Sequence, residues 1–254
     1  MPSFYADVRA VFTDLDGTLT TAGRLLPSTY EALAALSAAG VSVVVVTGRP
    51  AGWGDALLRL WPVAAVVAEN GGVVLFPARK VLAVRRGLPA VRRRMAAAAA
   101  AAARTVRGAR LARDTPYTEV NMALDWNEDV HLGEAAARRL EAFLRGRGFR
   151  AVRSSVHVNF WPPGFDKLTA CRQVAAELFD GAGLNAFLYV GDALNDEPMF
   201  AGFPRSVGVA NVRDVWDELA AHPTRVTRRR EGRGFEEVAA AVLRQRARRS
   251  TEVR

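Results

Sequence analysis

The stretch V-R-A-V-F-T-D-L-D-G-T-L, residues 8–19, decides the fold of this chain. Its apolar first half is too short for a helix and has the composition of a buried parallel strand. Gly17 ends the strand, so Asp14 and Asp16 lie at its carboxyl end. Burying an unpaired carboxylate is unfavourable unless it binds a cation or takes part in a reaction. The two aspartates are therefore candidate functional groups, although an acidic turn without function would have a similar sequence.

The composition is that of a globular protein. The chain has 254 residues, 50% of them apolar, which gives room for one large domain or two modest ones. A single cysteine, Cys171, excludes an internal disulfide and fits a reducing compartment. The sequence has no apolar run of membrane-spanning length and no secretory signal pattern at its start. We therefore expect a soluble, cytoplasmic protein without membrane contact.

The net charge of +9 would suit a nucleic-acid partner, but its distribution argues against one. Only two of the 35 basic residues, Lys80 and Lys167, are lysines, so the many arginines reflect a general bias in composition. The arginine clusters also lack the interleaved aromatic side chains on which bases stack. We expect no nucleic-acid partner, whereas an anionic substrate would gain from the positive field.

Strands and helices alternate at both ends of the chain. After the first strand, buried strands are expected over 41–46 and 63–68, and helices over 28–39 and 55–60. Ser28, with Glu31 three residues on, has the spacing of a capping box at a helix start. From residue 166 we expect a helix over 166–178, strands over 186–190 and 206–209, and helices from 195, 214 and 235.

The middle of the chain has a different, α+β character. Its expected elements are a hairpin over 73–76 and 80–84, helices over 88–106 and 134–145, and strands over 118–126, 149–153 and 156–161. We predict an α/β fold, in which a Rossmann-like parallel sheet has helices on both faces and carries an inserted α+β domain. The core comprises residues 1–81 and 164–254, and the inserted domain comprises residues 82–163.

Polar groups follow four separate buried strands. Because the carboxyl ends of parallel strands share one edge of a sheet, ligands bind in the crevice there. These groups are Asp14 and Asp16; Thr47, Gly48 and Arg49; Glu69 and Asn70; and Asp192, Asn195 and Asp196. Together they predict a site at this edge.

The residue types narrow the chemistry of this site. Carboxylates from different segments form a hard oxygen site suited to Mg²⁺. A carboxylate beside such a metal can attack phosphorus, and a second one can hold the proton that the leaving alcohol needs. Thr47, the Gly48 amide, Asn195 and Lys167 are of the right type to surround a phosphoryl group. Lys167 is notable because this chain uses arginine almost everywhere else and because a helix start disfavours a cation.

Four motifs resemble those of haloacid dehalogenase (HAD) superfamily phosphatases. E-N-G-G at 69–72 and the insertion after it resemble subfamily IIB, the Cof-type branch, whose α/β cap lies over the active site. The opening resembles that of sugar-phosphate and mannosyl-phosphoglycerate phosphatases. The four motifs are D-L-D-G-T-L at 14–19, V-T-G-R at 46–49, Lys167, and G-D-A-L-N-D at 191–196.

The resemblance implies a role for each motif. Asp14 would be the nucleophile and a metal ligand, and Asp16 the general acid/base and a ligand through its backbone carbonyl. Thr47 and Lys167 would bind the phosphoryl group. Asp192 would complete the Mg²⁺ site, with Asn195 or Asp196 nearby.

Substrate choice is expected to come from the face of the inserted domain that lies over the crevice. His157, Asn159 and Trp161 alternate along one strand and so share a face, opposite Val158 and Phe160. Together with the core residues Arg49, Asn70 and Asp196, the candidates for substrate contact or for supporting the site are Glu128, His157 and Asn159.

We thus expect a Mg²⁺-dependent phosphatase that acts on a small phosphorylated metabolite, with a sugar phosphate favoured, as a monomer or homodimer. A phosphomutase with the same aspartyl-phosphate chemistry is the alternative. A receiver-type regulator would also group acidic residues, a threonine and a lysine, but it would need neither the insertion nor the second aspartate.

Overall fold

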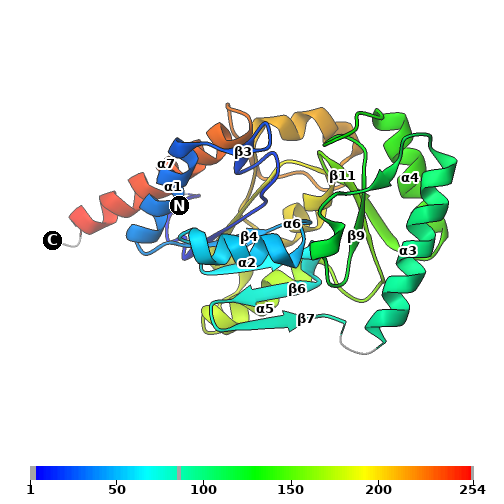
Figure 1. Cartoon of the computed structure of the whole chain (residues 1–254). Helices are drawn as coiled ribbons and strands as arrows, with labels where there is room; N and C mark the ends of the chain where they lie inside the picture. Colours follow the sequence, from blue (N-terminus) through cyan, green and yellow to red (C-terminus); the bar gives the residue numbers. More distant parts are fainter. Residues whose placement is uncertain (1–3, 85–86, 253–254) are drawn as a thin grey trace.

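In a computed structural model that describes residues 4–84 and 87–252, eight strands form the central sheet (Figure 1). In the edge-to-edge order given next, the first six strands are parallel to one another. The seventh strand pairs antiparallel with the sixth, and the eighth pairs antiparallel with the seventh. From edge to edge they are β14 (Arg225–Val226), β13 (Ser206–Gly208), β12 (Phe187–Gly191), β1 (Ala10–Thr13), β4 (Ser42–Val46), β5 (Ala65–Ala68), β6 (Val73–Phe76) and β7 (Arg79–Leu82). The predicted α/β fold is confirmed.

Strand β1 lies inside the sheet, between a strand from the later part of the chain and the next strand of this sheet in sequence. It pairs with β12 on one side and with β4 on the other, so that Val11 lies opposite both Leu188 and Val43. The strand order therefore reverses at β1, and the loops that follow β1 and β12 leave the sheet in different directions. The crevice between these loops is where the residues that follow Thr13 and Gly191 emerge.

Helices cover both faces of this sheet because its strands are apolar on both sides. Val11, Val43 and Val45 pack with one set of helices, and Phe12, Val44 and Tyr189 pack with the other. The first set is α1 (Pro27–Ala38), α2 (Ala51–Leu60) and α7 (Glu231–Glu252); the second is α5 (Lys167–Leu178), α6 (Glu197–Gly202) and the 3₁₀ segment η5 (Ala210–Glu218). Short 3₁₀ turns η3 (Leu184–Ala186) and η4 (Leu194–Asp196) and a hairpin of β2 (Thr20–Thr21) and β3 (Arg24–Leu25) complete this part.

A second, four-stranded antiparallel sheet lies beside the first, at the right in Figure 1. Residues 88–161, which we call the insert, build it. Val158, Phe160 and Leu124 of its strands pack against helices α3 and α4 and form a separate apolar core. The insert comprises α3 (Leu88–Thr105), β8 (Arg110–Leu111), η2 (Thr115–Tyr117), β9 (Met122–Asp125), α4 (Glu134–Gly146), β10 (Arg150–Arg153) and β11 (His157–Trp161).

One local prediction was wrong for a tertiary reason. Ser28 does not cap α1, which begins at Pro27, because its hydroxyl donates to Glu236 of α7 at 2.7 Å. Proline suits the first position of a helix, where no backbone N–H is needed.

The fully buried carboxylate of Glu69, in the turn η1 (Glu69–Gly71) after β5, explains two further differences. It accepts backbone N–H groups of residues 119–121, at 2.6 to 2.9 Å, so these residues do not join the strand predicted over 118–126. It also accepts the N–H of Ala51, which lets α2 begin four residues earlier than expected. A single side chain of the main sheet thus fixes the chain that runs through the insert.

Among the described residues, no helix is both long enough and apolar enough to cross a membrane.

We predict that Glu69→Gln costs about 3 kcal/mol of unfolding free energy, because one of its two acceptor oxygens becomes a donor facing backbone N–H groups. The measurement is urea unfolding of the two proteins. Glu119→Gln, which alters a largely exposed ion pair with Lys80, is the control and should cost less than about 1 kcal/mol. Equal losses in the two variants would contradict the role given to Glu69.

Candidate active site

The residues that follow β1, β4, β5 and β12 meet at one edge of the main sheet. Asp14, Thr47 and Asp192 are each at most 4% exposed and come from three neighbouring strands. Lys167, at the start of α5, is buried with them. The structure therefore brings together side chains that are up to 178 positions apart in the sequence.

Lys167 is the centre of this group. Its Nζ donates to Asp14 Oδ1 and to Asp196 Oδ1, both at 2.8 Å. The hydroxyl of Tyr189 also donates to Asp196 Oδ1, at 2.6 Å. Burial alone would lower the pKa of Lys167, but the carboxylates of Asp14 and Asp196 raise it above its ordinary value. The lysine is therefore held as a cation beside the aspartate at the end of β1.

Close packing of backbone places the lysine there. The N-cap of α5 is Asp166, whose carboxylate accepts the N–H of Thr169. Gly71 in the turn η1 lies against it, with φ of +94°, and a Cβ at this position would lie 2.2 Å from the Asp166 carbonyl oxygen. Only glycine fits here, so the E-N-G-G turn brings the start of α5 to the edge of the sheet.

Three carboxylates form a cluster in which a divalent cation could bind. Asp14, Asp192 and Asp196 each offer an oxygen atom within 4.8 Å of the others. Burial, then the neighbouring Asp196, raises the pKa of Asp14 to about 8, although Lys167 opposes this. Burial and the other two aspartates likewise raise the pKa of Asp192 well above its ordinary value. Buried oxygen ligands with this excess of negative charge fit a hard cation such as Mg²⁺.

Asp192 is held for such a role by two donors. The hydroxyl of Thr18 donates to its Oδ1 at 2.7 Å, and the amide of Asn211 donates to its Oδ2 at 2.9 Å. Gly17 lies so close that a Cβ there would be 2.6 Å from Asp192 Oδ2. The glycine after Asp16 therefore lets two neighbouring loops meet over the cluster.

The side chain of Asp16 turns away from this cluster. Its two oxygens accept from Nε and Nη2 of Arg49 at 2.8 and 2.9 Å. The carboxylate thus forms no part of the cluster, so the expected contribution of Asp16 to a metal site would rest on its backbone carbonyl, as the family resemblance implies. Arg49 also binds two acidic residues of the insert, Asp114 and Glu128.

Glu128 and His157 connect the insert to this arginine. His157 Nε2 lies 2.9 Å from Glu128 Oε2, and Glu128 Oε1 accepts from Arg49 at 2.6 Å. These contacts, the one with His157 first, lower the pKa of Glu128 to about 2. The carboxylate therefore stays ionised.

Amide side chains surround the loop after β4. The N–H of Arg49 donates to Thr47 Oγ1, and Asn121 of the insert donates to the Gly48 carbonyl. Four buried asparagine side chains have polar atoms without a partner among the described residues, namely Asn70, Asn121, Asn159 and Asn195. A small cavity between Asp14 and the insert is lined by two of these, Asn159 and Asn195. Unpaired buried amides are costly, so this cavity is built to receive a polar group.

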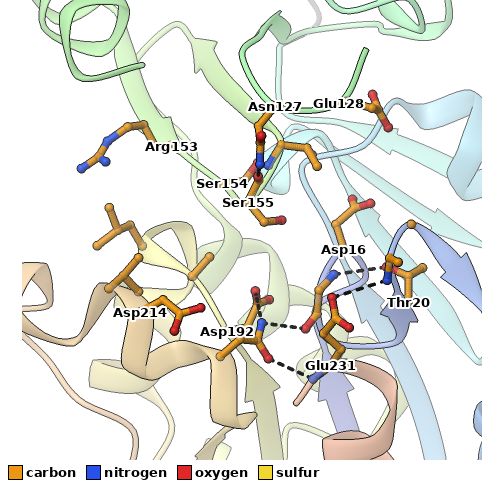
Figure 2. Close-up of a pocket in the computed structure, with 18 of the residues that line it drawn as sticks. Asp16, Thr20, Asn127, Glu128, Arg153, Ser154, Ser155, Asp192, Asp214 and Glu231 are labelled. Carbon is orange, nitrogen blue, oxygen red and sulfur yellow. Dashed lines mark hydrogen bonds between the residues drawn. The ribbon is translucent and has the colours of Figure 1, made fainter. Parts of the chain in front are cut away.

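A larger cavity of about 490 Å³ opens outward from Asp16 and Asp192. Figure 2 shows Asn127, Ser154 and Ser155 of the insert on the side opposite these two aspartates. Of the residues predicted for substrate contact, Glu128 lines this cavity, whereas His157 and Asn159 line the smaller one.

Several residues at the site lie outside the sequence-based prediction. Thr18 is part of the D-G-T-L motif, so its position next to Asp16 was the one available signal. Asp114, Ser154, Ser155, Tyr189 and Asn211 lie in segments whose patterns indicate only turns or packing, and contacts that are distant in sequence give them their place.

Comparisons with known proteins agree with the motifs. The model of the haloacid dehalogenase-like hydrolase family matches residues 11–93. The phosphoglycolate phosphatase of Haloarcula marismortui is 30% identical over 239 residues, which cover 92% of this chain and 97% of the relative. That of Halorubrum lacusprofundi is 33% identical over 214 residues, covering 82% and 86% respectively.

Solved structures share the fold. A protein of Thermoplasma acidophilum superposes with a TM-score of 0.73 at 18% identity, covering 92% of this chain and 98% of that one. A sugar phosphatase of HAD subclass IIB superposes with a TM-score of 0.64 at 16% identity, covering 92% and 97%. At these identities the likeness concerns the fold, including the insert.

We predict that Mg²⁺ stabilises the protein more at pH 8 than at pH 5. The pKa of Asp14 is raised from 3.8 to about 8, so its contribution to stability is complete below about pH 4 and is lost as the pH rises through 8. The metal-free protein therefore weakens over this range, and a bound cation offsets the loss. The measurement is Tm by calorimetry with EDTA or about 10 mM Mg²⁺, at matched ionic strength. An equal gain in Tm at both pH values would contradict the prediction.

Proposed function

Because the chain belongs to the haloacid dehalogenase-like hydrolases, as a phosphatase of that family, we propose that it hydrolyses a small sugar phosphate with Mg²⁺ through an aspartyl-phosphate on Asp14. The observation that carries the proposal is the buried contact of Asp14 with Lys167 inside a carboxylate cluster, below a cavity large enough for a small metabolite. A carboxylate placed in this way is a nucleophile for phosphorus rather than a structural group.

The proposed reaction has two steps. First, an Asp14 oxygen forms a bond to phosphorus, the bond from phosphorus to the substrate oxygen breaks, and Asp16 gives its proton to the leaving alcohol. Second, a water oxygen attacks the same phosphorus, the bond to Asp14 breaks, and Asp16 takes the proton of the water. Lys167 balances the charge of Asp14 and of the phosphoryl oxygens in both steps.

The residues available for the metal fit Mg²⁺. Asp14 and Asp192 would hold it with the backbone carbonyl of Asp16, and Asp196 supports the cluster through Lys167. When bound, Mg²⁺ would neutralise charge on the phosphoryl oxygens.

The phosphoryl group would lie beside Asp14, next to the small cavity, whose volume of about 10 Å³ leaves room for about one water molecule. Thr47, the backbone of Gly48 and Asn195 line it from the main sheet, and Asn159 lines it from the insert. The amide nitrogens of Asn159 and Asn195 could donate to phosphoryl oxygens, whereas their unpaired Oδ1 atoms are acceptors and would take hydrogen bonds from water molecules around the group.

We further propose that residues 82–163 form a cap domain over a core of residues 1–81 and 164–254. Of these, residues 1–3, 85–86 and 253–254 lie outside the part of the chain that the structure describes. The insert has its own apolar core, and it supplies one wall of the large cavity through Asn127, Ser154 and Ser155. The leaving group would therefore be recognised mainly by the cap.

The charges of the large cavity favour a neutral, hydroxylated leaving group. Three arginines line it, and each is already paired: Arg49 with Asp16, Arg153 with Glu134 and Arg230 with Asp214. A substrate carboxylate would find no free cation among these lining residues, whereas hydroxyl groups can bond to their carboxylates and to Ser154 and Ser155. The relatives named above are phosphoglycolate phosphatases, so substrate choice is the point on which we expect this chain to differ.

We predict that Asp14→Asn lowers Mg²⁺-dependent phosphate release by at least about a thousandfold, because the amide is not a nucleophile. The fold should persist, and at pH 8 without metal the Tm should be unchanged or higher, since one of three clustered carboxylates is removed. Activity within about tenfold of wild type would exclude Asp14 as the nucleophile.

We predict at least about tenfold higher kcat/KM for 2-hydroxyethyl phosphate than for 2-phosphoglycolate, and for glycerol 1-phosphate than for 3-phosphoglycerate. Each pair differs mainly by a hydroxymethyl group in place of a carboxylate, so size is nearly constant. A panel of sugar phosphates, measured by phosphate release with and without Mg²⁺, would extend the comparison. Preference for the carboxylates would contradict the charge argument while leaving the phosphatase assignment intact.

A further inference from the structure

We propose that Glu128 and Asp114 of the insert are positioning residues for Asp16 and act on it through Arg49. The inference rests on the proposed function, in which Asp16 is the general acid/base. It adds that this group is placed correctly only while the insert is seated on the main sheet.

The hydrogen bonds of Arg49 carry the argument. A guanidinium has five N–H donors, and Arg49 makes five bonds to carboxylates. Two go to Asp16, at 2.8 and 2.9 Å, from Nε and Nη2. The other three go to the insert: one to Asp114 at 3.2 Å, and two to Glu128 at 2.6 and 3.2 Å.

Burial makes these bonds interdependent. Arg49 is 5% exposed, so N–H groups left without acceptors would be costly. If the insert moved away or lost its two carboxylates, the guanidinium would have to turn toward other acceptors. The ring of Trp53, 4.8 Å from the Arg49 carbon Cζ, fixes one face of the guanidinium and leaves rotation within its plane as the easier response.

Any turn of the guanidinium moves Asp16. Arg49 binds Asp16 in a bidentate manner, with Nε and Nη2 each donating to one carboxylate oxygen. This geometry fixes both the position and the plane of the Asp16 carboxylate. Each oxygen uses one lone pair for Arg49 and keeps another for the proton that it exchanges with the leaving group or with water. Proton transfer is sensitive to this placement, because donor and acceptor must come within hydrogen-bond distance.

Glu128 is itself fixed from the insert. Its backbone N–H donates to Asp125, and its side chain contacts His157 of β11 at 2.9 Å. Three charged side chains, Glu128, Arg49 and Asp16, therefore form a continuous chain of hydrogen bonds from the insert to the proposed acid/base. The insert thus supplies a wall of the pocket and also sets the position of the acid/base.

The test compares two aryl phosphates of nearly equal shape but different leaving-group acidity. Phenolate needs a proton from the acid, whereas 4-nitrophenolate leaves without much help. If Glu128 acts through Asp16, Glu128→Gln should lower kcat/KM, which reports the step that releases the leaving group, about tenfold more for phenyl phosphate than for 4-nitrophenyl phosphate. Asp114→Asn should shift the ratio in the same direction by a smaller factor, since it accepts one bond of the five.

Glu218→Gln is the matched control. Glu218 of η5 pairs with Arg153 and Arg138 of the insert, so this variant also weakens an ion pair between insert and main sheet, without contact to Asp16. We expect its ratio of the two substrates to equal that of wild type. A second check uses Asp16→Asn, in which adding Glu128→Gln should leave the ratio unchanged, because the two residues act in one series.

The outcomes separate the two proposals. Equal losses of kcat/KM on both substrates in Glu128→Gln, or the same shift of the kcat/KM ratio in Glu218→Gln, would overturn the positioning role and leave the phosphatase assignment standing. A further shift from Glu128→Gln in the Asp16→Asn background would also overturn it. A wild-type protein inactive on both substrates with Mg²⁺ would overturn the proposed function together with the positioning role.

Discussion

The contact between Lys167 and the two carboxylates of Asp14 and Asp196 is the interaction on which the rest of the site depends. Burying three aspartates within 4.8 Å of one another is unfavourable, and a single lysine offsets only part of that charge. The remaining excess of negative charge is what would attract a cation to the site. Burial, together with this excess of negative charge, raises the pKa of Asp14 and Asp192.

Two buried side chains, which follow neighbouring strands of the main sheet, bind the insert and hold it in place. Glu69, after β5, binds the backbone of residues 119–121, and Arg49, after β4, binds Asp114 and Glu128. One contact fixes the path of the chain through the insert, and the other ties the insert to the acid/base group. A substrate enclosed between the two lobes would therefore meet a catalytic group whose position depends on both.

The strand order explains why the site lies at the carboxyl-terminal edge of the main sheet. The order reverses at β1, so the loops after β1 and β12 diverge and leave a crevice, and the insert lies over it. In the proposed reaction, the phosphoryl chemistry would use residues at the base of the crevice, whereas the leaving group would face serines and paired charges of the insert. The insert would thus recognise the leaving group and also hold Asp16 through Arg49, whereas Asp14 lies on the main sheet alone.

The sequence by itself determined the α/β fold and the meeting of Asp14, Thr47, Lys167 and Asp192 at one edge, because apolar strand runs and the turns that end them are local patterns. It also indicated that His157 and Asn159 share a face. Only the tertiary structure decided that Asp16 binds Arg49, which lies 33 residues away, and that Arg49 also binds Asp114 and Glu128, 65 and 79 residues beyond it. The partners of Ser28 and Glu69 were hidden for the same reason: a hydrogen bond between distant segments depends on how they pack, and no local pattern encodes it.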